Sequence, residues 1–315
     1  MTVMSERRTS AMAKPLWKRM AYKHRFLYVM FIPIAAYYLL FSYIPLAMGL
    51  VISFQDFRIG NNLFTAQWAG LENYKTVFTS PAILRSVRNT LVISLLKLLF
   101  GFIPPIILAI CLYDIKNRVY KRVSQTIVYI PHFFSWVIVY GIFFAFFSTG
   151  AGVVNQLVEL ATGGRINFFL DPFWFLFLII FSSIWKSIGW SSILYMAALS
   201  SVNTELFEAA KLDGCGPFKR VWYVTLPCIL PIIGFVLTMS IGSIMTTDFE
   251  QILMFYNTQV YDVADVIPTW VYREGLGKFK YGLGAAVGIL NGAVGVVLIS
   301  LGNSISRKFS GRGMW

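Results

Sequence analysis

The chain has 315 residues, of which 57% are hydrophobic and 13% charged, and its formal net charge is +13. Soluble domains of this size carry about 25% charged residues, so the composition excludes an ordinary soluble protein. The three cysteines show neither zinc-type spacing nor the pattern of a disulfide framework.

The first 25 residues are basic and mostly polar, and they run directly into a long apolar segment. A cleaved signal peptide would have a shorter apolar core, followed by small residues at a cleavage site. We therefore expect a cytoplasmic tail and a retained membrane anchor.

Six apolar segments follow, each long enough for a helix that crosses a hydrocarbon core of about 30 Å. Their approximate bounds are 26–54, 89–113, 123–147, 173–200, 228–255 and 283–305. The sequence therefore predicts an all-α integral membrane fold with six transmembrane helices. Prolines inside several segments predict kinks, which membrane helices tolerate when neighbours satisfy the freed backbone groups.

The basic residues predict the orientation of these helices. The tail, the loops 114–122 and 201–227 and the C-terminal end hold 17 of the 27 Lys and Arg, whereas the alternate loops hold 8. Because cytoplasmic loops are the more basic, both termini are expected inside the cell. The positive charge thus follows the membrane topology, which argues against a nucleic-acid partner.

The segment 203–227, between the fourth and fifth spans, predicts a cytoplasmic elbow of two short helices. Asn203 or Thr204 can cap the first helix, Gly214 and Gly216 can end it, and Pro217 suits the first turn of the second. The second helix carries one mostly apolar stripe, formed by Phe218, Val221, Trp222, Thr225 and Leu226. Such an elbow could dock a partner, or it could lie on lipid headgroups.

Two groups of residues in this elbow resemble the EAA signature of ABC importer permeases. They are Glu208-Ala209-Ala210 with Gly214, and Val224-Thr225-Leu226-Pro227, in which Val224 replaces the commoner Ile. The stretches YIPHFFSWVIV (129–139) and ADVIPTWVYREGL (264–276) further resemble the carbohydrate uptake type, in particular its complex-oligosaccharide and alginate importers.

This resemblance implies a type I (MetI-like) permease fold over 26–306, with tails at 1–25 and 307–315. It also implies that the elbow is a coupling helix on which a separate ATPase docks, through Glu208, Ala209, Ala210, Gly214, Leu226 and Pro227. The implied partners are a second homologous permease, two ATPase subunits, a periplasmic or lipid-anchored solute-binding protein and membrane lipid. ATP and Mg²⁺ would be bound by the ATPases, so this chain is expected to be no enzyme and to hold no cofactor. Its stretch GLGKFKYG (275–282) lacks the phosphate-loop spacing.

Polar residues within the spans are candidates for a substrate pathway, because each is costly in lipid and needs a reason. One group is Lys186, Ser187 and Trp190 on the fourth span, with Ser183 on the same side; a second is Ser240, Ser243, Thr247 and Asp248 on the fifth. A lysine there could equally snorkel or pair within the bundle, and polar stripes can join helices. Lys97, early in the second span, is expected to be structural.

The last outer loop holds Asp265, Tyr272 and Arg273, which we expect at a periplasmic gate or a binding-protein contact. We predict a permease in the bacterial cytoplasmic membrane that imports oligosaccharides, with an acidic, alginate-like cargo as one option suggested by Lys186. An ion-coupled secondary transporter and an ABC permease for amino acids or peptides are the alternatives. The sequence leaves open the cargo and the choice between a heterodimer and a homodimer.

Overall fold

The computed structural model describes residues 25–245 and 248–310, without side-chain detail at 305, 306 and 308–310. The expected tail before Arg25, the residues Thr246 and Thr247 and the last five residues lie outside the described part. The chain divides into two units, residues 1–51 and 52–315.

The first unit contains most of the first predicted span. It consists of α2 (Arg25–Tyr38), a π-helical turn η1 (Leu39–Tyr43) and the greater part of α3 (Ile44–Ser53), which continues to the unit boundary and just beyond it. No residue of α2 or η1 is buried. An apolar helix with no buried face needs lipid or another chain around it.

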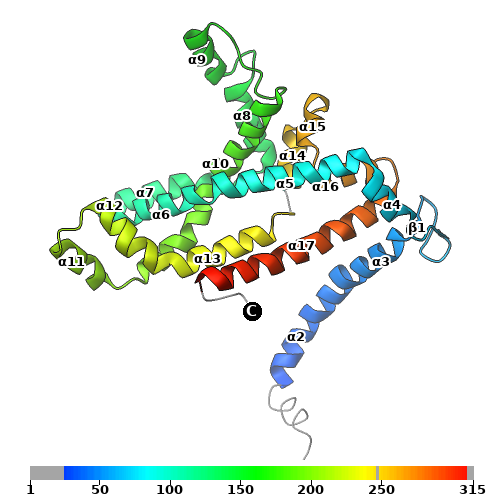
Figure 1. Ribbon diagram of the computed structural model, residues 1–315, viewed down its shortest axis with the longest axis horizontal. Helices are drawn as coiled ribbons and strands as arrows, with labels where there is room; N and C mark the ends of the chain where they lie inside the picture. Colours follow the sequence, from blue (N-terminus) through cyan, green and yellow to red (C-terminus); the bar gives the residue numbers. More distant parts are fainter. Residues whose placement is uncertain (1–24, 246–247, 311–315) are drawn as a thin grey trace, which may run out of the picture. The chain divides into compact units, whose positions relative to one another are not determined.

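The second unit opens with a short hairpin and the second span (Figure 1). Strands β1 (Gln55–Asp56) and β2 (Gln67–Trp68) pair antiparallel, and α4 (Glu72–Thr79) follows. The second span is made of α5 (Pro81–Gly101) and α6 (Ile103–Asp114). Helix α5 begins at Pro81 rather than at residue 89, because proline is favoured in the first turn of a helix. The first turns of α5 are polar, so the apolar segment used for the prediction begins only later.

The span predicted over 123–147 is bent near its proline, as the sequence predicts, but it begins earlier and is broken into two helices. Helix α7 (Arg118–Tyr129) passes into a 3₁₀ turn η2 (Ile130–Phe133), and α8 (Trp136–Phe147) then leaves at an angle of 106°. The bend follows Pro131. Ser135 is the N-cap of α8: its backbone is extended, and its hydroxyl accepts a hydrogen bond from the Ile138 amide. Helix α9 (Val153–Thr162) comes next.

Helix α10 (Pro172–Ser200) matches the fourth predicted span, because Asp171 caps its first turn. The elbow begins with α11 (Thr204–Leu212), capped by Asn203. After a turn, α12 (Pro217–Arg220), the π-helical turn η3 (Val221–Thr225) and α13 (Leu226–Gly242) follow without a break. The fifth span is therefore continuous with the elbow from Pro217, and does not start at residue 228.

The fifth span also ends earlier than predicted, at Gly242 instead of residue 255. Residues Phe249–Phe255 form a separate helix, α14, and a series of short turns leads to the last span. These turns are η4 (Thr258–Val260), α15 (Tyr261–Ala264), α16 (Ile267–Trp270) and η5 (Val271–Leu276), followed by α17 (Tyr281–Ser310). Helix α17 thus runs past the predicted end of the membrane domain at 306.

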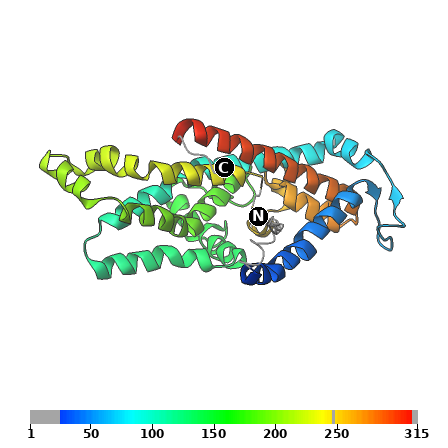
Figure 2. The ribbon, with the colours of Figure 1, turned by 90° about the horizontal axis from the view of Figure 1, so that it is seen from below.

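Within the second unit, α13 lies along α17, and α10 packs across α5 and α6 (Figures 1 and 2). The elbow at α11 and α12 and the β1–β2 hairpin lie at opposite ends of this unit (Figure 1). In the described residues, five helices are long and apolar enough to span a membrane, and the bent α7–α8 pair would make a sixth. Over the described residues, the regular secondary structure is therefore helical apart from this hairpin, as predicted.

Candidate substrate cavity and coupling elbow

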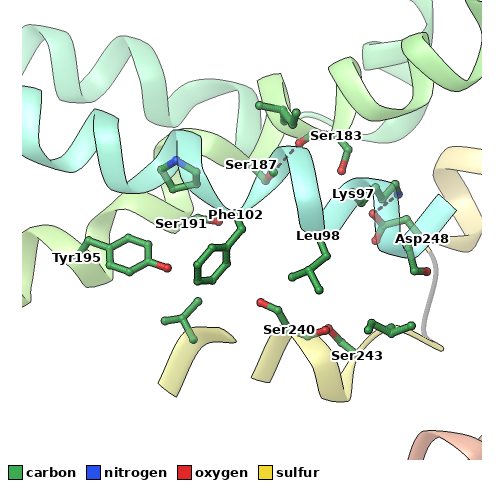
Figure 3. Close-up of a pocket in the computed structure, with 16 residues that line it drawn as sticks. Lys97, Leu98, Phe102, Ser183, Ser187, Ser191, Tyr195, Ser240, Ser243 and Asp248 are labelled. Carbon is green, nitrogen blue, oxygen red and sulfur yellow. Dashed lines mark hydrogen bonds and ion pairs between the residues drawn. The ribbon is translucent and has the colours of Figure 1, made fainter. Parts of the chain in front are cut away.

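A polar cavity of about 440 Å³ lies among α5, α6, α10 and α13 and is also lined by Asp248 (Figure 3). Most of its polar groups are hydroxyls, contributed by Ser94, Ser183, Ser187, Ser191, Tyr195, Ser240 and Ser243. Three of these serines recur every fourth residue on α10, which places them on one helix face. The remaining lining is largely apolar, with Phe102 beside Tyr195.

The charged groups of the cavity are concentrated at one end. Lys97 on α5 lies 3.1 Å from a carboxylate oxygen of Asp248, and its ammonium group also donates a hydrogen bond to the side-chain carbonyl of Gln251. Gln251 is fully buried, and its amide donates to the Ile179 carbonyl and the Ser182 hydroxyl of α10 at 2.7 and 2.9 Å. The lysine is thus held between α5, α10 and the start of α14.

Four of the predicted pathway residues line this cavity, namely Ser187, Ser240, Ser243 and Asp248. The second group was predicted as a stripe on one continuous helix, and that expectation is wrong. Ser240 lies in α13, Ser243 caps its C-terminus and Asp248 precedes α14. Thr247 lies outside the described residues. Because Ser240 and Asp248 belong to separate segments, helical periodicity is not what places them at the same cavity.

Lys186 and Trp190 do not line the cavity. The Lys186 ammonium donates to the carbonyl of His132 at 2.6 Å and lies 5.4 Å from the centre of the Trp136 ring, while Trp190 stacks on the His132 ring at 4.5 Å. Each helical residue advances by about 100°, so Lys186 points well away from Ser187. Both side chains contact the bend between α7 and α8, and a role for them in transport stays a prediction.

Lys97 lines the cavity, although the sequence analysis expected it to have only a structural role. Its side chain is 15% exposed, and it is the one cation among the described residues that line the cavity. The available signal was its position inside an apolar span, where an unpaired lysine would cost about 2.5–3.5 kcal/mol. The partner could not be identified, because Asp248 follows 151 residues later.

The elbow has the predicted turn at Gly214, whose φ of +74° favours glycine. Glu208 and Ala209 are exposed, whereas Ala210 is buried within the chain. The predicted apolar stripe is divided, because the π-helical turn inserts an extra residue per turn. Its members Phe218 and Trp222 are 91% and 68% exposed, but Thr225 is buried.

The end of the elbow signature lies on the fifth span itself. Leu226 is half-buried and packs in the cluster around Tyr195 and Ile229, and Pro227 is exposed in the first turn of α13. An ion pair of 3.2 Å between Arg220 and Asp114 connects the elbow to the end of α6. The elbow is therefore joined to two of the spans that line the cavity, α6 by this ion pair and α13 by the continuous helix.

Two of the three predicted gate residues are joined in the structure. Arg273 forms a bidentate ion pair with Asp265 at 3.0 and 2.7 Å, and Asp265, which is 6% exposed, also accepts a hydrogen bond from the Thr269 hydroxyl at 2.9 Å. These hydrogen bonds to Asp265 hold the pKa of Arg273 above its usual range, although burial alone would lower it. Tyr272 points elsewhere and packs against Phe249.

The fold and its hydroxyl-lined cavity are those of an integral membrane transport subunit. The family model for the inner membrane component of binding-protein-dependent transport systems matches residues 101–310. Protein LplB of Bacillus subtilis is 40% identical over 95% of this chain and 94% of its own length. The polygalacturonan/rhamnogalacturonan transport system permease protein YteP of the same organism is 37% identical over 93% of this chain and 91% of its own.

Two solved structures share the whole fold. A chain in the crystal structure of a bacterial alginate ABC transporter, in complex with its alginate pentasaccharide-bound periplasmic protein, superposes with a TM-score of 0.86 at 36% identity, over 95% of this chain and 99% of that chain. A chain of a bacterial ABC transporter for import of the acidic polysaccharide alginate gives 0.84 at 38% identity, over 93% and 99%.

The chain therefore belongs to the family of binding-protein-dependent transport system inner membrane components. It has the MetI-like permease fold and is a permease subunit of an ABC importer in the bacterial cytoplasmic membrane. Within the described residues, no group of three or more His, Cys, Asp or Glu side chains is placed to hold a metal ion.

Proposed function

We propose that this permease imports oligosaccharides, including acidic ones, through a pathway that includes the cavity between α5, α10 and α13. The observation that carries the proposal is the lining of that cavity, where hydroxyl groups from three helices surround a space of about 440 Å³. Sugars present hydroxyls that exchange hydrogen bonds with serine side chains, and apolar ring faces that pack on aromatic groups such as Phe102 and Tyr195.

The relatives support a sugar cargo. Proteins named for polygalacturonan and rhamnogalacturonan, for arabinooligosaccharides and for lactose are all similar to this chain, and the two solved neighbours belong to alginate importers. Polygalacturonan and alginate are polymers of uronic acids. An acidic oligosaccharide is thus a reasonable cargo for a cavity that contains a cation.

By the same family membership, the working unit would contain a second homologous permease, two ATPase subunits that bind ATP and Mg²⁺, and a solute-binding protein that is periplasmic or lipid-anchored. The elbow would be the ATPase contact, because Phe218 and Leu212 are 91% and 89% exposed there, next to the exposed Glu208 and Ala209. Closure of the ATPases would move the elbow and, through the unbroken helix from Pro217, the fifth span.

The outer loop would form the opposite contact. Asp265 and Arg273 would hold its shape through their ion pair, while Tyr272, which is 49% exposed, would be available to the binding protein or the gate. Together these assignments give alternating access, with cargo released from the binding protein at one end and the ATPases acting at the other.

The test is uptake by the complete complex in lipid vesicles. We expect ATP-dependent uptake of a labelled oligosaccharide that requires the loaded binding protein. Phe218→Ser should weaken co-purification of the ATPases, whereas Leu160→Ser, at an 85% exposed leucine of α9 away from the elbow, should leave it intact. Uptake that followed a proton or sodium gradient, with no ATPase bound, would contradict the proposal.

A further inference from the structure

The Lys97 ammonium group has one rigid neutral partner and one accessible charged partner. Gln251 is fully buried and anchored to α10 by two hydrogen bonds, so its carbonyl is fixed. The Asp248 side chain is 53% exposed, against 15% for the lysine. Among the described residues these two partners use two of the three N–H donors of the ammonium group.

Because Gln251 is fixed and Asp248 is not, the partner of Lys97 that a solute can replace is the Asp248 carboxylate. A lysine in a low-dielectric interior needs an anion nearby, because an unpaired buried charge is strongly unfavourable. A carboxylate on a solute can take the place of Asp248 and leave the Lys97 ammonium group paired with an anion, and the Asp248 side chain, which is 53% exposed in this chain, is not fixed by packing. A neutral hydroxyl cannot make this exchange, since it would leave the ammonium group without a counter-ion.

The surroundings of Lys97 suit an acidic sugar rather than a small inorganic anion. In Figure 3 the Lys97–Asp248 pair lies at one end of the cavity and Tyr195 at the other, with Ser187 and Ser240 between them. A solute bound by the lysine at its carboxylate would extend along these hydroxyls. The cavity thus combines one anion position with several positions for hydroxyl groups.

Resting on the oligosaccharide import proposed above, we infer that Lys97 is the residue that selects for a uronate carboxylate during transport, and that Asp248 occupies this position when no cargo is present. Lys97 is thereby a specificity-determining residue of the pathway, and Asp248 is a built-in competitor. The position is distinct from that of Lys186, whose ammonium group is bonded to the His132 carbonyl outside this cavity.

The experiment compares two matched solutes in the complete complex. Uptake of an oligogalacturonate and of its methyl ester, which has the same skeleton without the charge, is measured in vesicles with the loaded binding protein. The variants are Lys97→Met, Asp248→Asn and the double variant Lys97→Met/Asp248→Asn, with Lys186→Met as the control lysine. The double variant carries no unpaired charge, so it remains informative if Lys97→Met fails to fold.

We expect Lys97→Met and the double variant to lose oligogalacturonate uptake by about 10- to 100-fold, the worth of a hydrogen bond to a charged group, while uptake of the ester is unchanged. Asp248→Asn should lower the half-saturating concentration of oligogalacturonate by removing its competitor. Lys186→Met should leave the ratio of the two solutes as in the wild type.

The inference is overturned if the double variant takes up oligogalacturonate at the wild-type rate, or if it loses both solutes equally. It also fails if the wild type imports the ester or other neutral oligosaccharides and no oligogalacturonate, although oligosaccharide import itself would then stand. Failure to import any sugar, with the ATPases bound and active, would instead reject the proposed function.

Discussion

Gly189 of α10 lies directly against the main chain of Val128 in α7, so close that a β-carbon at residue 189 would overlap the Val128 carbonyl group. This contact fixes the crossing of the two helices just before the bend that leads into α8. On the same side of α10, Lys186 and Trp190 hold His132 of the bend by a hydrogen bond and a ring stack. The bend is therefore shaped by α10 as well as by its own proline.

Gly189→Ala should disturb this crossing. Because the atoms in the way belong to the backbone, they cannot turn aside, and we expect a loss of at least about 1–3 kcal/mol of stability. Gly141→Ala is the matched control, since a β-carbon on that helical glycine of α8 meets nothing within 4 Å. Thermal melting of the purified complex measures both, and equal melting temperatures for the two variants would show that α7 and α10 are not in such close contact.

Lys186→Met should affect stability but not selectivity. The variant loses the charged hydrogen bond to the His132 carbonyl, worth about 1.5–3 kcal/mol, and weakens the bend. Because Lys186 lies outside the cavity, the preference between acidic and neutral oligosaccharides should stay as in the wild type. Melting and competitive uptake test the two halves of this prediction, and a changed preference would place Lys186 in the pathway after all.

Gly214→Ala should impair coupling through backbone strain alone. Nothing lies within 4 Å of a β-carbon there, but φ is +74°, where an L-residue costs about 1–2 kcal/mol. Gly216→Ala is the control two residues away, with equally open space and an ordinary φ of −66°. We expect transport per ATP hydrolysed to fall for Gly214→Ala and not for Gly216→Ala. Equal coupling in both variants would indicate that the turn at Gly214 is unimportant for docking.

Glu274 should contribute a pH-dependent part of the stability of the segment around η5, before the last span. Burial by itself raises its pKa, but the ion pairs with Lys278, at 2.7 Å, and with Lys280 and Arg273 bring the pKa below its ordinary value. A depressed folded-state pKa stabilises the fold fully above the unfolded value of about 4.3, and this contribution is lost as the pH falls below it.

Melting of the wild type and Glu274→Gln across this range tests the effect. The wild type should be the more stable at pH 7, and the difference should shrink below about pH 4.3. Lys278→Gln should remove part of the same advantage at neutral pH. A difference between wild type and Glu274→Gln that stayed constant with pH would contradict the ion-pair account.

Local signals in the sequence were sufficient for the elbow and the fourth span. Gly214 has the positive φ expected of a helix-ending glycine, Pro217 begins the following helix, and α10 starts and ends within one residue of its predicted bounds. Each of these features depends on residues within one or two turns of each other. The long apolar segments likewise predicted helices, because a helix satisfies the hydrogen bonds of its own backbone inside a bilayer.

The ends of the other spans and the charged part of the cavity could not be predicted in this way. The predicted fifth span was extended through the polar stretch SIMTTDFEQ (243–251) to the apolar residues behind it, whereas α13 ends at Gly242 and α14 starts anew at Phe249. The prediction therefore placed Ser240 and Asp248 on one helix, whereas they line the same cavity from two different segments of the chain.

Composition, charge distribution and a local signature were enough to recognise a helical membrane protein of the ABC importer permease family, because each of them can be read without knowing which helices are neighbours. The tertiary structure decided which lysine faces the cavity. Lys97 meets Asp248 across 151 residues of chain, whereas Lys186, equally costly in lipid, is turned to the backbone of His132. Both are lysines in apolar helices, and their different roles follow from which neighbouring helix each one packs against.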